Sequence, residues 1–81
     1  MTPNDLKKGT RIRLRNGWYG TMADNMKGNT RLVDVEGDFR EIGSVYATDI
    51  VAASIDGQGW VTITPTPAML KAARARAKWG F

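Results

Sequence analysis

The sequence predicts a mainly β protein: a small barrel of five or six antiparallel strands followed by one C-terminal α-helix. Three observations lead to this fold class. Short segments alternate strictly between apolar and polar residues, which is typical of half-buried strands. Turn-forming pairs such as Asn16-Gly17 separate these segments, and after Pro65 the composition changes abruptly to residues that favour helices. With 81 residues the chain forms a single domain, with the barrel over 1–64 and the helix over 65–81.

The first two strands are predicted to form a hairpin. The segment TRIRLR at 10–15 alternates arginines with apolar residues, so one side of the strand faces the core. Asn16-Gly17 suits the positive φ angles of a tight turn, and 18–24 is expected to return as the second strand. Gly20 in that segment indicates a bulge or a close approach of another backbone.

The remaining strands are expected over 31–36, 39–46, 50–55 and 60–64, joined by turns at Gly37-Asp38 and 56–59. Alternation directs Val33 and Val35 inward, whereas it directs Trp60 outward with Val61 and Ile63 in the core. Short strands with glycines at their corners close most readily into a barrel, because closure removes exposed strand edges. This argument predicts the barrel.

A helix of about 12 residues is predicted after Pro65, since Thr66 is a suitable N-cap and Pro67 a suitable first helical residue. Its apolar stripe is small and is expected to consist of Leu70, Ala73 and Ala77. A basic stripe lies beside it, formed by Lys71, Arg74 and Lys78. Because an isolated helix of this length is marginal in water, we expect it to pack on the barrel or on a partner.

Part of the chain resembles a known motif. The segment KGTRIRL at 8–14, followed by Asn16-Gly17 and by GTM at 20–22, resembles the KOW motif of SH3-like barrels, with Gly20 in the place of the motif's glycine in the returning strand. The segment 41–51 is similar to the closing part of such barrels, where a short turn carrying an aspartate leads into the last strand. The resemblance implies an SH3-like barrel that contacts RNA, DNA or a transcription complex, although such barrels also bind peptides and methylated tails. The whole chain also resembles short bacteriophage or prophage proteins.

The composition excludes several classes of site. The chain contains no histidine and no cysteine, so disulfides, Cys/His zinc sites, thiol nucleophiles and imidazole catalysis are excluded. Asp34, Glu36 and Asp38 alternate as in a calcium loop, but the downstream glutamate of such a loop is missing. We therefore expect a non-enzyme without metal or cofactor. No apolar run approaches the roughly 20 residues of a membrane span, and 1–10 lacks the apolar core of a signal peptide, so we expect a cytoplasmic protein without membrane contact.

Charge is divided along the chain. Residues 1–31 hold seven basic and two acidic side chains, 32–56 hold one basic and six acidic, and 57–81 hold four basic and none acidic. Arginines two apart on a strand project from one face about 6.6 to 6.8 Å apart, close to the spacing of successive phosphates, and neighbouring rings can stack on bases. We therefore predict a site for nucleic acid, not for a small-molecule substrate, formed by Lys8, Arg11, Arg13, Arg15, Trp18, Tyr19, Lys27, Lys71, Arg74 and Lys78.

Two other interpretations stay open. The arginines can pair across a solvated sheet face with Asp34, Glu36 or Glu41, while Trp18 fills the core. Alternatively, the acidic middle and outward aromatics such as Trp60 belong to a protein-interaction module, for example an adaptor or inhibitor of a host protein complex. The chain is expected to be a monomer or a weak homo-oligomer that associates through a sheet edge.

Overall fold

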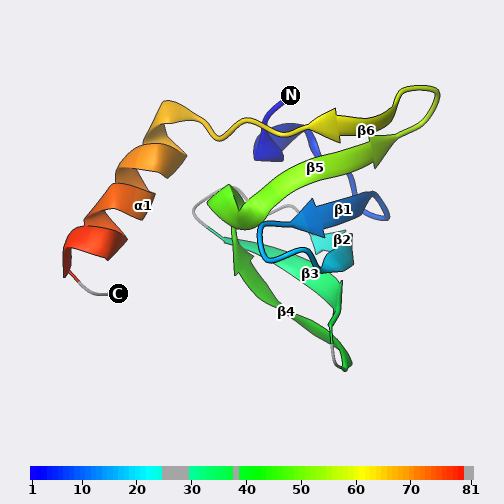
Figure 1. Cartoon of the computed structure of the whole chain (residues 1–81), viewed down its shortest axis with the longest axis horizontal. Coiled ribbons are helices and arrows are strands. Elements are labelled where there is room, and N and C mark those ends of the chain that lie inside the picture. Colours follow the sequence, from blue (N-terminus) through cyan, green and yellow to red (C-terminus); the bar gives the residue numbers. More distant parts are fainter. Residues whose placement is uncertain (25–29, 38, 80–81) are drawn as a thin grey trace.

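One antiparallel sheet and one helix dominate the described part of the chain, which in this computed structural model comprises residues 1–24, 30–37 and 39–79 (Figure 1). In chain order the elements are the 3₁₀ helix η1 (Pro3–Asp5), β1 (Arg11–Leu14), β2 (Tyr19–Asp24), β3 (Thr30–Glu36), β4 (Arg40–Tyr46), the 3₁₀ helix η2 (Ala47–Asp49), β5 (Ile50–Ile55), β6 (Gly59–Thr62) and α1 (Pro67–Trp79). The predicted mainly β class, with six antiparallel strands and a C-terminal helix, is therefore confirmed.

The strands follow the order β4-β3-β2-β1-β5-β6. Strands β1 to β4 form a meander, after which η2 brings the chain back so that β5 pairs with the free side of β1. Strand β6 then adds to β5 as a final hairpin. Within the described residues the sheet is open, with β4 and β6 at its two edges, so the predicted closure into a barrel is not seen.

The core lies on one side of this sheet. In β1 the predicted alternation holds, because Ile12 and Leu14 are buried while the arginines beside them are exposed. Val33 and Val35 also point into the core as predicted, and Leu6 reaches it from the segment that follows η1. Fully burying an aliphatic side chain of this size stabilises the fold by about 1.5 to 3 kcal/mol, so a few such residues supply much of the stability.

Gly20 lies where β2 and β3 pack closely. A methyl group in its place would lie 2.6 Å from Val33 Cγ1 and 3.1 Å from the carbonyl oxygen of Asp34. The close backbone approach predicted for this glycine is therefore confirmed. The irregularity in β2 falls further along, between Met22 and Asp24.

The first hairpin has a different turn from the one expected. Only Gly17 of the Asn16-Gly17 pair has a positive φ angle, +92°. The amide of Gly17 donates to the carbonyl of Leu14 at 2.9 Å, and the amide of Leu14 donates to the carbonyl of Trp18 at 2.7 Å. The loop therefore has three residues with glycine at its left-handed position, a common alternative to the two-residue turn. The Asn16 side chain accepts a hydrogen bond from the Trp18 amide at 3.0 Å.

Helix α1 begins as predicted. The hydroxyl of Thr66 accepts a hydrogen bond from the Met69 amide at 3.3 Å, which makes Thr66 the N-cap and Pro67 the first helical residue. The helix stands at one end of the sheet and covers neither face (Figure 1). Its main contacts are with η2.

The face on which α1 docks differs from the predicted stripe. Met69 is buried and Arg76, seven residues later on the same side of the helix, contacts Tyr46 and Thr48. Leu70, by contrast, is exposed. The predicted stripe was wrong because the alanines carry little apolar area, so the long side chains of Met69 and Arg76 determine which face packs.

Candidate functional site

Arg11 and Arg13 project from the sheet face that points away from the core, which we call the outer face. Arg11 forms an ion pair with Glu36 on β3, and its guanidinium carbon lies 5.6 Å from the centre of the Tyr19 ring. Both members of the ion pair keep about two fifths of their side-chain surface in solvent. An ion pair this exposed contributes little stability, so a phosphate can compete with Glu36 for the guanidinium.

A second aromatic ring completes the cluster. Trp60 on β6 meets Tyr19 on β2 with 5.7 Å between ring centroids and an interplanar angle of 49°. Strands β1 and β5 lie between these two strands. The rings meet because β5 carries only small side chains here, Ala52 opposite Arg13 and Ser54 opposite Trp60.

Arg13 lies beside this aromatic pair. It is opposite Tyr19 on one side and Ala52 on the other. It is exposed, and within the described ranges no carboxylate pairs with it. Arg13 is therefore a cation available to an anionic ligand.

The outer face continues into a groove with two lysines, which we call the lysine groove. This hollow of about 630 Å³ is lined by Lys7 and Lys8 together with Arg11 and Ser54. Asp5 and Asp56 also line it, and the Asp5 carboxylate accepts a hydrogen bond from the Thr2 amide at 2.8 Å. Because Arg11 and Ser54 belong to both the groove and the outer face, Lys8 lies close to the arginine cluster, as the sequence predicted.

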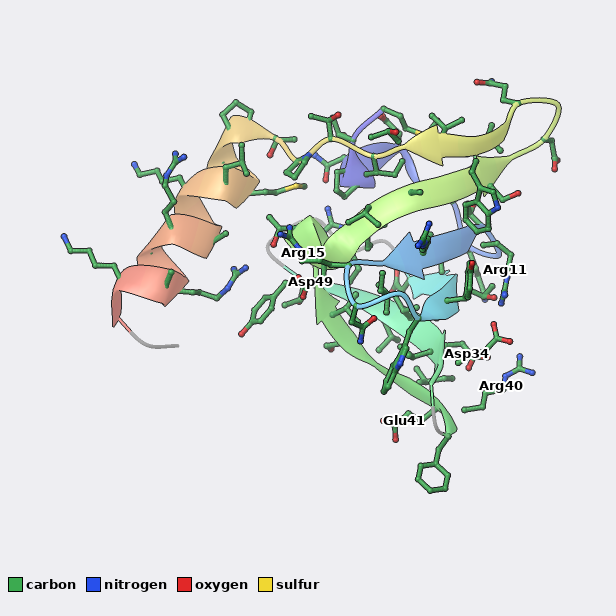
Figure 2. All side chains as sticks on the ribbon, in the orientation of Figure 1. Arg11, Arg15, Asp34, Arg40, Glu41 and Asp49 are labelled. Carbon is green, nitrogen blue, oxygen red and sulfur yellow. The ribbon has the colours of Figure 1, made fainter. Side chains whose placement is uncertain are left out.

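Arg15 and Trp18 lie elsewhere. They line a hollow of about 540 Å³, here called the inner groove, whose apolar floor includes Leu14, Val35 and Val45. The Arg15 guanidinium donates to the Thr48 carbonyl at 2.7 Å and pairs with Asp49 at 3.6 Å. Arg11 and Arg15 point away from opposite ends of β1 (Figure 2).

Trp18 neither fills the core nor joins Tyr19. It is exposed to about the same extent as Tyr19, and its ring lies against Gly37, where an added methyl group would be 2.3 Å from a ring carbon. The predicted cluster of three arginines and two aromatic rings is thus divided. Arg11, Arg13 and Tyr19 are together on the outer face, whereas Arg15 and Trp18 border the inner groove.

The basic stripe of the helix does not extend the outer face. Lys71, Arg74 and Lys78 are exposed and lie on the side of α1 opposite Arg76, which faces η2. Lys27, the remaining predicted residue, lies outside the described residues.

Three of the five described carboxylates in the acidic middle, 32–56, pair with arginines. Glu36 pairs with Arg11 and Asp49 with Arg15, and the carboxylate of Asp34 accepts hydrogen bonds from Arg40 at 3.0 to 3.3 Å, which raise the pKa of Arg40 (Figure 2). Of the cross-strand pairs that the sequence left open for the arginines of 11–15, the described residues show one, Arg11 with Glu36. Arg15 pairs instead with Asp49 of η2, and Trp18 does not fill the core as that interpretation expected.

Another basic residue, Arg31, has a structural role. It is 1% exposed, and it donates to the Thr30 carbonyl at 2.7 Å and to the Asn4 side chain at 2.6 Å. Burial lowers its pKa. Arg31 therefore joins η1 to β3 and is not part of the exposed basic surface.

Sequence reasoning assigned Trp60 to the outside but not to the arginine site. Its contact with Tyr19 depends on β6 lying two strands from β1, an arrangement that local alternation does not reveal.

Comparisons with protein families, with curated proteins and with solved structures found no match for this chain. In the described part of the chain, no helix is long and apolar enough to cross a membrane.

Proposed function

We propose that this protein is a non-catalytic module that binds nucleic acid, mainly through phosphates, on the outer face of β1, β2 and β6. The observation that carries the proposal is the placement of Arg13, a cation without a carboxylate partner in the described residues, beside Arg11 and the exposed rings of Tyr19 and Trp60. Exposed arginines next to aromatic rings are the usual composition of a nucleic-acid surface.

The spacing of the cations supports this function. Arg11 and Arg13 are two residues apart on β1, about 6.6 to 6.8 Å along the strand, and the lysine groove adds Lys7 and Lys8 beyond Arg11. Phosphates bound by a few such cations release counterions, so binding is expected to weaken steeply with salt and to depend little on sequence.

The same proposal includes membership of the SH3-like barrels of KOW type in a cytoplasmic protein of phage or prophage origin. The connection from β4 to β5 supports the SH3-like part of this proposal. There η2 carries Asp49 and leads directly into β5, which returns to pair with β1, as expected for the closing part of such a barrel.

The test is a fluorescence anisotropy titration with labelled single-stranded and duplex oligonucleotides at low and moderate salt. We expect binding at low salt that Arg13→Ala weakens for both forms of nucleic acid. The matched control is Arg15→Ala, which removes the same charge from the inner groove, away from the outer face, and leaves binding nearly unchanged. Absence of binding at low salt, or equal losses in the two variants, would contradict the proposal.

A second candidate function is favoured by β4. This edge strand carries Ile42, 65% exposed, and follows Phe39, 82% exposed. An unpaired strand edge with exposed apolar residues is a surface to which another protein can add a strand. A pull-down from host lysate with and without nuclease separates the two functions, since a partner that survives nuclease and is lost in Ile42→Lys favours the β4 edge.

A further inference from the structure

We infer that the outer face selects unpaired nucleotides over duplex, because Trp60 offers its ring as a stacking surface beside the arginines. This inference rests on the proposed function and specifies the class of ligand, single-stranded nucleic acid. It assigns a binding role to Trp60, which the charge pattern of the sequence did not include in the site.

Both rings of the aromatic pair are exposed. Trp60 is 51% exposed and Tyr19 is 40% exposed. At 49° the two rings are tilted, so neither covers the face of the other as a parallel stack would. The guanidinium of Arg11 already lies over the Tyr19 ring, which leaves Trp60 as the main open aromatic surface of the cluster.

Cations lie close to Trp60. Its cross-strand partner is Ser54, an exposed small residue that also lines the lysine groove with Arg11. The phosphates on either side of a base stacked on Trp60 can therefore reach cations, namely Lys7 and Lys8 in the lysine groove and Arg11 on β1. Stacking and phosphate binding can occur on consecutive parts of one strand.

A duplex can contact less of this surface than a single strand can. In a duplex each base face is covered by its neighbours, so only phosphates and groove edges reach a flat protein surface. Duplex would contact Arg13 and the lysine groove without Trp60, whereas a single strand would use both. The difference in affinity between the two ligands should therefore depend on Trp60.

The experiment compares Trp60→Ala with the wild type, using short oligo(dT), short oligo(U) and a DNA duplex at the same low salt. Loss of one stacked base corresponds to about a 5- to 150-fold weaker affinity. We expect a loss in this range for both single strands and a loss below about twofold for the duplex. Trp60→Phe keeps an aromatic face and should recover most of the single-strand affinity.

The matched control is Phe39→Ala. Phe39 directly precedes β4, the edge strand opposite β6, so removing its exposed ring should leave every affinity unchanged. Circular dichroism and thermal melts show whether each variant is folded. The indole of Trp60 also gives a direct signal in a Trp18→Phe, Trp79→Phe background, where oligo(dT) should quench its fluorescence.

The outcomes distinguish the two proposals. Binding to single strands and duplex with equal affinity, unaffected by Trp60→Ala, would overturn the inference and leave the proposed function in place. Absence of binding to any of the three ligands would overturn both. A loss with oligo(U) but not with oligo(dT) would restrict stacking on Trp60 to RNA and support the stacking role.

Discussion

Tyr19 and Trp60 bring their ring centroids to within 5.7 Å although two strands, β1 and β5, separate the strands that carry them. The small outer residues of β5, Ala52 and Ser54, leave the space that the rings occupy. This contact links β6 to β2 across the outer face. It thereby fixes the position of the candidate site.

If the rings interact directly, their effects on stability are coupled. A double-mutant cycle of Tyr19→Leu and Trp60→Leu should give a coupling energy of about 0.5 to 1.5 kcal/mol from urea denaturation. Additive effects would mean that the rings are neighbours without a direct interaction.

Two glycines provide a matched pair for the packing of the sheet. Gly20→Ala forces a methyl group against Val33 and the Asp34 carbonyl, and should lower the free energy of unfolding by about 1 to 3 kcal/mol. Gly43→Ala meets no atom within 4 Å and should be neutral or stabilise by up to about 1 kcal/mol. Equal effects of the two substitutions in chemical denaturation would show that Val33 can move aside.

Arg31 should stabilise the fold through its hydrogen bonds. Arg31→Met keeps apolar bulk but removes the hydrogen bonds to the Thr30 carbonyl and to the Asn4 side chain, and should cost about 1 to 3 kcal/mol of unfolding free energy. Arg13→Met, at an exposed position, serves as the comparison and should change stability little. A more stable Arg31→Met variant would mean that desolvating the cation outweighs its hydrogen bonds.

The docking of α1 depends on Arg76. Its guanidinium lies 3.7 Å from the centre of the Tyr46 ring and donates to the Thr48 hydroxyl at 3.3 Å. Tyr46→Leu and Arg76→Ala should be coupled by about 0.5 to 2 kcal/mol in a double-mutant cycle. The control Arg74→Ala, on the opposite side of the helix, should show no coupling to Tyr46→Leu.

The stability should be nearly independent of pH around neutrality. The hydrogen bond from Arg40 to Asp34 raises the pKa of Arg40, which adds stability that is lost only as pH rises through that pKa. Burial lowers the pKa of Arg31, which costs stability until pH rises through that pKa. Arginines titrate far above neutral and the chain has no histidine or cysteine.

Chemical denaturation between about pH 6 and 9 tests this expectation. The free energy of unfolding should vary by less than about 1 kcal/mol over that range. A steep transition near neutral pH would reveal a perturbed carboxylate that the described residues do not explain.

Local patterns predicted much of the fold because burial alternates along strands such as β1 and β3. The sequence of β1 sufficed to place Ile12 in the core and Arg11 outside, and Thr66-Pro67 sufficed to place the start of α1. The docking face of the helix could not be predicted in this way. It depends on Tyr46 and Thr48, which belong to a distant part of the chain.

The candidate site was predicted only in part for the same reason. Arg11, Arg13 and Tyr19 share one hairpin, so strand periodicity was enough to bring them together. Trp60 joins them through the pairing of β5 with β1 and of β6 with β5, and Arg15 leaves them because β1 ends at Leu14. Both results follow from tertiary pairing and not from local sequence.

An NMR titration of the labelled protein with short oligo(dT) at low salt tests whether nucleic acid binds at the outer face. We expect shifts of the amides of Arg11, Arg13 and Tyr19 and of the indole NH of Trp60, which disappear when salt is raised. Shifts confined to Phe39 and Ile42 on the β4 side, or to α1, or no shifts at all, would contradict this expectation.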